Sequence, residues 1–236
     1  HVQIKVRGIA GGGVSVINGI FFDPPPAPSV TVQVVADFSE TDNAYAGEVV
    51  ANDLANTGQA TLTSFTSSTT PQFGAGGQNN GTYGLADTVA AAWYKPAQLP
   101  AALTFELNTN SATAGYVITA IRTFAGWKGG GTQTYANQKY GVEYRTVGSA
   151  DWTALETVDY SPFSSLVNTP ANTRVVLSAP AGNLLSNVAA LRFNFQVPTR
   201  ADGTNNGTIL QEIDVTGYPE DTTMASTVAI STPAER

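Results

Sequence analysis

The sequence predicts an all-β protein, most simply an antiparallel β-sandwich. Between residues 30 and 217 no stretch shows sustained helical periodicity. Short runs of β-branched and aromatic residues instead alternate with Gly, Asn, Pro and Ser, which is typical of strands separated by turns. The runs are VTVQVVADF, LTFEL, YVITAIRTF, KYGVEYRTV, TRVVLSA, ALRFNFQV and TILQEIDVTG. Charged residues make up only 12% of the chain, which suits a secreted β-protein with polar, uncharged faces.

The first 22 residues are expected to form a β-hairpin, because two β-rich runs flank the glycines of AGGG. A two-stranded hairpin is not stable alone in water, so this one must complete the sheet of this domain, of a preceding domain or of a neighbouring copy. Residues 23–29, DPPPAPS, follow as a semi-rigid linker. The chain begins in strand-like alternation without an initiator Met, and we expect it to be a piece of a larger extracellular protein.

The sandwich is expected over residues 30–218, and the polar segment 219–236 reads as a linker or an extended tail. Two long connections, 66–92 and 198–208, are rich in Gly, Asn and Thr, and loops of this length are often functional. Each contains the sequence NNGT. The resulting sequons make Asn80 and Asn206 candidate glycosylation sites, although such sequons also arise readily in Asn/Thr-rich loops.

Composition excludes several classes of function. The net charge of −7, without basic clusters, argues against nucleic acid as a partner. Without cysteine there is no disulfide, thiolate nucleophile or thiolate metal site. His1 is the only imidazole, so a Ser-His-Asp triad or a multi-histidine zinc site is not expected. No apolar run reaches the roughly 20 residues that span a bilayer, so membrane insertion is not expected.

The stretch 124–158 holds the main ligand-binding candidates. Trp127 and Lys128 precede three glycines, so they are expected on or beside a flexible loop, whereas Trp152 is expected in the core. An exposed aromatic ring can stack on a sugar, and Lys can bond to hydroxyls; the alternative is that Trp127 covers the edge of the core. The expected ligand face comprises Tyr94, Trp127, Lys128, Tyr135 and Arg200.

Two segments also carry a family resemblance. ITAIRTFAGWKGGGTQTYANQKYGVEYRTVGSADWTAL resembles the middle of galactose-binding-like, or discoidin-type, β-sandwiches, as found in family-32-like carbohydrate-binding modules. NVAALRFNFQVPTRADGTNNGTILQEIDVTG is similar to the close of that fold, where an Arg-containing strand leads to I-x-E-I-x-V-x-G. The resemblance covers roughly residues 30 to 217. It implies an eight-stranded jelly roll that is non-catalytic and is often appended to secreted carbohydrate-active enzymes.

The resemblance also implies a structural calcium ion. The acidic position of the family's closing strand falls on Glu212, and its partner from the first loop falls on Asp53. Glu212, one further acid and several carbonyl oxygens would suit calcium, while a hydrogen-bonded Glu at a strand edge is the simpler alternative. The sugar-gripping His/Arg/Asn set and the vertebrate members' cysteine pair are absent, so the fold can transfer while the ligand does not.

Glu212 and Asp214 also form a candidate acid pair. Two positions apart on a strand, their Cβ atoms lie about 6.5–7 Å apart on one face. That overlaps the spacing of inverting glycosidase carboxylates. Such acids usually come from different elements of a cleft, so we expect a closing strand in which Glu212 holds a cation and Asp214 is solvated.

Two functional hypotheses follow, neither of them enzymatic. The first is an extracellular or cell-surface carbohydrate-binding or adhesion module that recognises a glycan or cell-surface polysaccharide. The alternative is a structural subunit of an extracellular fibre, sheath or surface layer, in which residues 1–22 add a strand to another copy of the chain.

Overall fold

A computed structural model describes most of the predicted sandwich. The described residues are 28–37, 44–51, 53–56, 60–66, 72–73, 77–84, 92–127, 133–164, 170–198 and 207–220. The predicted hairpin at 1–22 and the tail from 221 lie outside them, as does the linker apart from its last two residues.

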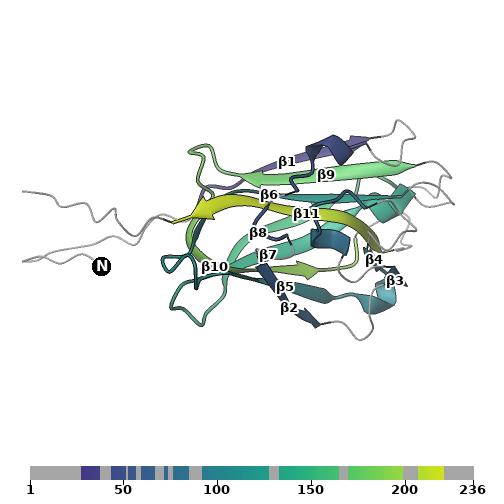
Figure 1. Cartoon of the computed structure of the whole chain (residues 1–236). Coiled ribbons are helices and arrows are strands. Elements are labelled where there is room, and N and C mark those ends of the chain that lie inside the picture. Colours follow the sequence, from purple (N-terminus) through teal and green to yellow (C-terminus); the bar gives the residue numbers. More distant parts are fainter. Residues whose placement is uncertain are drawn as a thin grey trace, which may run out of the picture.

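All seven predicted runs form strands, and the prediction of an all-β fold is confirmed (Figure 1). The sequence GSADW, residues 148–152, also predicts a tight turn before a returning strand in WTALETV, and that strand is observed as β8. Three further strands, β2, β3 and β4, were not predicted. The strands are β1 Thr31–Asp37, β2 Ala60–Thr66, β3 Gln72–Phe73, β4 Ala92–Tyr94, β5 Ala101–Leu107, β6 Tyr116–Trp127, β7 Gln138–Thr146, β8 Thr153–Tyr160, β9 Ala171–Ser178, β10 Leu185–Phe195 and β11 Thr208–Pro219. The helical turns are 3-10 in type: η1 Ala46–Glu48, η2 Gly77–Asn79, η3 Pro96–Gln98 and η4 Gln133–Ala136.

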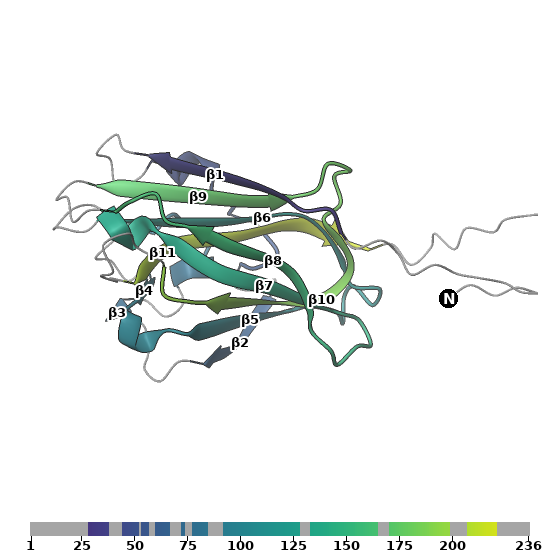
Figure 2. The same cartoon turned by 180° about the vertical axis from the view of Figure 1, so that it is seen from behind.

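The strands form two facing antiparallel layers within one continuous sheet (Figures 1 and 2). One layer has the order β1-β9-β6-β11-β4-β3, and the other has the order β8-β7-β10-β5-β2. Strand β10 joins them: Leu185 and Val188 pair with β6, whereas residues 190–195 pair with β5 and β7. The eleven strands exceed the eight that the resemblance implied, because short strands such as β3 and β4 extend one layer.

The core lies between the layers and is dominated by aromatic rings. Tyr94 stacks on Phe195 at a centroid distance of 5.2 Å, and Phe105 meets Phe193 edge-on at 5.8 Å. Both layers therefore contribute to one apolar interior. In the part of the chain that the structure describes, no helix has the length and apolarity needed to cross a bilayer.

Strand β11 occupies the middle of its layer, between β6 and β4. It pairs with β6 from Leu210 opposite Ala125 to Pro219 opposite Tyr116, with two register shifts on the way. Gly217 sits at the second shift, where a Cβ atom would collide with the Val117 carbonyl and the Leu54 side chain. This close packing places β11 against the polypeptide that precedes β2, which is how distant segments meet at the site.

Candidate functional site: a buried carboxylate cluster and a loop end

Strand β11 directs two carboxylates out of the core. Ile213 and Val215 belong to the interior, so the alternation of the strand places Glu212 and Asp214 on the outer face of the layer. Both acids are nevertheless 0% exposed. The expectation that Asp214 is solvated is therefore wrong, because segments from elsewhere in the chain cover this face.

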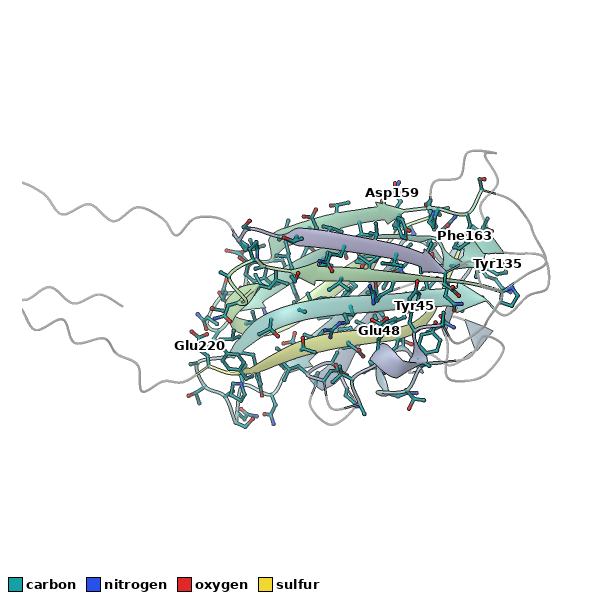
Figure 3. All side chains as sticks on the ribbon, turned by 90° about the horizontal axis from the view of Figure 1, so that it is seen from above. Tyr45, Glu48, Tyr135, Asp159, Phe163 and Glu220 are labelled. Atoms are coloured by element: carbon teal, nitrogen blue, oxygen red, sulfur yellow. The ribbon has the colours of Figure 1, made fainter. Side chains whose placement is uncertain are left out.

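The cover consists of residues 44–51, 53–56 and 77–84, which hydrogen-bond to β11. The Leu54 amide donates to the Val215 carbonyl at 2.7 Å, and the Gly84 amide donates to the Gln211 carbonyl at 3.0 Å. Apolar contacts add to these bonds, because Tyr45 and Tyr83 pack with Phe124 of β6. Figure 3 shows Tyr45 and Glu48 beside this layer. Backbone bonds and an aromatic cluster thus hold both segments over the acids.

A third carboxylate comes from the cover itself, since Asp53 is only 2% exposed and lies beside the other two. Asp53 Oδ1 accepts hydrogen bonds from the amides of Ala55 at 2.7 Å and Val215 at 3.1 Å. Glu212 Oε1 accepts from the Gly81 amide at 3.0 Å, and Asp214 Oδ2 accepts from the Val50 amide at 2.9 Å. We call these three residues the acid cluster.

Each carboxylate of the acid cluster has a second oxygen without a hydrogen-bond partner. These buried oxygens are Asp53 Oδ2, Glu212 Oε2 and Asp214 Oδ1. One oxygen of each side chain lies within 4.8 Å of the others. Buried acceptors of this kind are costly unless they are protonated or bound to a cation.

Burial dominates the electrostatics of the cluster. Burial first, and then the neighbouring charges of Asp214 and Asp53, together raise the pKa of Glu212 from 4.5 to about 9. Burial also raises the pKa of Asp214 from 3.8 to about 7, although Arg122 opposes that change. The pKa of Asp53 is raised for the same reason. Without a bound cation, Glu212 is therefore protonated at neutral pH, and the protein alone does not stabilise three ionised carboxylates at this site.

The donor set fits a hard divalent cation. It offers carboxylate oxygens, without thiolate or imidazole, and calcium prefers six to eight oxygen ligands. Gly81 keeps the cover closed around the cluster: its φ is +72°, and a Cβ there would lie 2.6 Å from the Ala51 carbonyl oxygen. The structure thus brings together the two predicted metal ligands, Glu212 and Asp53, and adds Asp214.

The predicted sugar-binding residues are distributed differently from expectation. Tyr94 is 0% exposed and stacks in the core, so its assignment to the ligand face is wrong. Tyr135 is half-buried in η4, at the end of the sandwich far from Glu220 (Figure 3). Trp127 is the last residue of β6, and only its backbone is described. Lys128 and Arg200 lie outside the described residues.

Only one of the two candidate glycosylation sites lies among the described residues. Asn206 lies outside the described residues, whereas Asn80 is exposed. The Asn80 side-chain oxygen accepts a hydrogen bond from the Thr82 amide at 2.9 Å. Glycosylation at both positions stays a prediction.

The turn around Tyr135 is firmly held by Asn137, which is fully buried. The side-chain Nδ2 of Asn137 donates to the Phe163 carbonyl at 2.8 Å, and its side-chain oxygen accepts from the Phe163 backbone amide at 3.1 Å. Thr208 Oγ1 donates to the Asn137 carbonyl at 2.7 Å. We call Tyr135, Phe163 and the end of β6 the loop end; its base is held by these hydrogen bonds of Asn137.

The outer face of the second layer carries paired charges. Arg145 Nη2 lies 2.7 Å from both oxygens of Glu106, and Arg192 Nη2 lies 2.6 Å from Glu143 Oε2. Trp152 packs here, with the Arg192 guanidinium 4.3 Å from its ring centroid. Trp152 is therefore not in the core, contrary to expectation. We call the surface formed by Trp152 and these two ion pairs, Glu106–Arg145 and Glu143–Arg192, the paired-charge face.

Sequence reasoning missed Asp214 as a member of the cluster, although its i, i+2 spacing from Glu212 placed it on the correct face. It also missed Arg122, which lies opposite Asp214 in the register of β6 and β11. No sequence signal identified the cover, because its hydrogen bonds to β11 join residues more than 120 positions apart.

The sequence matches no protein-family model and no curated protein sequence. Several solved structures are similar. A carbohydrate-binding module, CBM32-3, of a family 31 glycoside hydrolase from Clostridium perfringens is 18% identical, with 73% of this chain and 97% of that chain covered and a TM-score of 0.44. An F5/8 type C domain from Bacteroides fragilis is 15% identical, with 67% and 97% covered and a TM-score of 0.39. A GH31 CBM32-2 module bound to GalNAc is 11% identical, with 80% and 98% covered and a TM-score of 0.33.

Proposed function

We propose that the chain is a non-catalytic carbohydrate-binding module that recognises a glycan through its loop end. The observation that carries the proposal is the hydrogen-bonded base at that end, where η4, which includes Tyr135, contacts β6. A pre-organised aromatic residue binds a sugar ring at a lower entropic cost than a flexible one. The sequence resemblance to galactose-binding-like sandwiches supports the same use of the fold.

The acid cluster supports a binding role over a hydrolytic one. A glycosidase needs two carboxylates that flank a sugar in an open cleft. Glu212 and Asp214 are covered by residues 44–51, 53–56 and 77–84 and have no exposed surface. In this arrangement the acids do not reach a glycosidic bond, and the same geometry suits a structural role.

Glycan binding is tested by titrating the chain with a panel of oligosaccharides by calorimetry. We expect Tyr135→Ala and Trp127→Ala each to weaken binding at least tenfold, which corresponds to about 1.4 kcal/mol. Tyr218→Ala is the matched control, because Tyr218 is 48% exposed and lies near the end of β11. Unchanged binding by the Tyr135/Trp127 double variant would show that the ligand face lies elsewhere.

We further propose that the acid cluster holds one structural calcium ion through Asp53, Glu212 and Asp214. When bound, the ion would supply the positive charge that the three carboxylates lack. The residues would then join the cover to β11 through their remaining oxygens. Calorimetric titration of the demetallated chain should reveal one site. That site should disappear in Glu212→Gln and persist in Glu106→Gln, and a Glu212→Gln variant with unchanged calcium affinity would contradict the assignment.

The proposed setting is extracellular or at a cell surface, as part of a larger protein. The alternative role, a subunit that assembles by strand addition, is favoured by one specific observation. Among the described residues, strand β1 has no partner strand on one edge, and its residues 31–36 are uncharged.

A further inference from the structure

Strand β1 leaves one edge and much apolar surface uncovered. Among the described residues it pairs with β9 alone, so the hydrogen-bonding groups of its other edge face outward. Val32, Val34 and Val35 are 40%, 42% and 39% exposed. They are three of the four large apolar side chains that the described ranges leave exposed. Apolar side chains on both faces of a free edge are typical of a strand that receives another strand.

The edge of β1 also lacks the usual protection against pairing. Residues 31–36, TVQVVA, contain no charge and no proline, and Asp37 is the first charged residue. Among the described strands, β8 is an edge strand of the other layer, and it carries Glu156 and Asp159. Asp159 forms an ion pair with Lys139 at 2.9 Å. Charged residues on an edge discourage added strands, so β8 is protected while β1 is not.

A pocket lies where the chain enters β1. Its volume is about 350 Å³, and Pro28 forms part of its wall. Tyr144, Leu184 and Leu185 provide apolar surface, and the remaining lining residues are Thr146, Asn183 and Ser186. The pocket is large enough to receive an aromatic side chain from a strand that lies along β1.

We propose that β1 accepts residues 14–22 of another copy of this chain as an added strand. The segment, VSVINGIFF, is uncharged and rich in β-branched and aromatic residues, so it complements the valines of β1. It lies upstream of the point where the described chain begins, and Phe21 or Phe22 would fill the pocket. This inference concerns a surface separate from the loop end and does not depend on glycan binding.

The linker favours a partner copy over the chain's own β1. DPPPAPS is a semi-rigid spacer, and at about 3.1 Å per residue it extends roughly 20 Å. Addition to its own β1 would require this spacer to reverse direction, because adjacent strands lie only about 4.8 Å apart. Exchange between copies leaves the spacer extended. Two copies can exchange strands reciprocally, or each copy can pass its strand to the next.

Cysteine cross-linking tests the pairing directly, because the chain contains no native cysteine. The variant Val34→Cys is mixed with Val16→Cys or Ile17→Cys, two neighbouring positions that face opposite sides of a strand. We expect a mixed disulfide dimer in one of the two mixtures under mild oxidation. Thr153→Cys, on the protected edge strand β8, replaces Val34→Cys as the control and should give none. A variant that carries both cysteines in one chain is compared with these mixtures. A disulfide that forms only within that single chain, or no disulfide in any sample, would overturn the proposal.

Light scattering during size exclusion provides an independent readout on the full-length chain. We expect concentration-dependent oligomers that become monomers in Val34→Lys and in Ile17→Asp, whereas Thr153→Lys keeps the wild-type mass. Unchanged circular dichroism spectra would confirm that the variants fold. Oligomers that persist in Val34→Lys, or a monomeric wild type at all concentrations, would contradict strand exchange at β1. Trp127→Ala should assemble normally, so failure of glycan binding and failure of assembly are distinguishable.

Discussion

The acid cluster and the paired-charge face both place carboxylates on the outside of a sheet layer, but the two sets of carboxylates differ in solvent exposure and in their partners. On the paired-charge face, Glu106 and Glu143 keep 33% and 25% of their side-chain surface exposed, and each contacts an arginine. In the acid cluster, Glu212 and Asp214 have no exposed surface, and each leaves one oxygen without a partner.

The difference lies in what covers each face. In the described chain, no segment covers the paired-charge face as the cover does β11. Its carboxylates are therefore stabilised both by solvent and by their arginine partners. The cover removes water from the acid cluster, and Arg122 is the cation that acts on Asp214 there. Burial without compensation raises the pKa of the acids, and a bound cation would reverse that effect.

The largest expected effect is that of calcium on stability. If the cluster binds calcium, an excess of 1,000 times the dissociation constant should stabilise the folded chain by about 4 kcal/mol. For a chain of this size that corresponds to an increase in melting temperature of roughly 8–16 °C. Calorimetric scans with calcium and with a chelator measure this difference. Glu212→Gln should abolish the calcium response, whereas Glu106→Gln should retain it; equal responses would remove the distinction between the two faces.

A smaller but sizeable effect is expected for Gly81→Ala. The residue has a φ of +72°, and an added Cβ would lie 2.5 Å from Asn56 Nδ2 and 2.6 Å from the Ala51 oxygen. We expect a loss of about 2–3 kcal/mol in urea unfolding, together with weaker calcium binding. Gly148→Ala is the matched control, because its φ is +79° but no atom lies within 4 Å of the added Cβ. Gly148→Ala should cost only about 1 kcal/mol.

The pH dependence of the calcium-free chain tests the unbalanced charge. The folded pKa of Glu212 is about 9 and that of Asp214 about 7, against 4.5 and 3.8 when unperturbed. As pH rises from about 4 to 7, the unfolded chain loses these protons while the folded chain keeps them. Each carboxyl therefore lowers the free energy of unfolding by up to about 1.4 kcal/mol per pH unit. This stability is fully present below pH 4.

Urea unfolding at several pH values between 4 and 7 measures that slope. Comparison with Glu212→Gln isolates the contribution of one carboxyl, and the variant should show a flatter decline. Glu106→Gln should leave the slope unchanged from the wild type. Parallel curves for Glu212→Gln and the wild type would mean that Glu212 titrates normally in the folded chain.

The smallest effect is expected on the paired-charge face itself. Arg192→Met removes the ion pair with Glu143 and the contact with Trp152. Because the partners remain in contact with water, the loss should be about 1 kcal/mol or less and should shrink at high salt. Urea unfolding in low and high salt measures it. A loss above 3 kcal/mol would show that this face is as strongly coupled to folding as the acid cluster.

The strands were accessible from sequence because their evidence is local. The run TILQEIDVTG alternates apolar and polar side chains, and that alternation survives in β11 despite its register shifts. The strands β3 and β4 were missed because they span two and three residues, which is too short for an alternating pattern of apolar and polar residues to be recognised. Tyr94 was misplaced for the same reason: a three-residue strand gives no indication of which face is buried.

The candidate site could not be predicted in full from local sequence patterns, because it is formed by contacts between residues far apart in the chain. Alternation placed Glu212 and Asp214 together on one face, but the burial of that face depends on residues 44–51, 53–56 and 77–84. Trp152 shows the converse, because an aromatic residue next to a predicted turn was expected in the core and instead packs beneath Arg192. In both cases the solvent exposure of the side chain was determined by segments that local sequence does not identify.

The central place of β11 has a consequence for how the chain is made. β11 is the last of the described strands, yet it lies between β6 and β4 and supplies two of the three acids of the cluster. During synthesis, the layer has a gap until residues 208–219 leave the ribosome, and the cover has nothing to bind. Ribosome-bound chains that stop before residue 208 should therefore be sensitive to protease across the segment 44–56. We therefore expect the sheet to close and the carboxylates to assemble together, late in synthesis, when β11 is added.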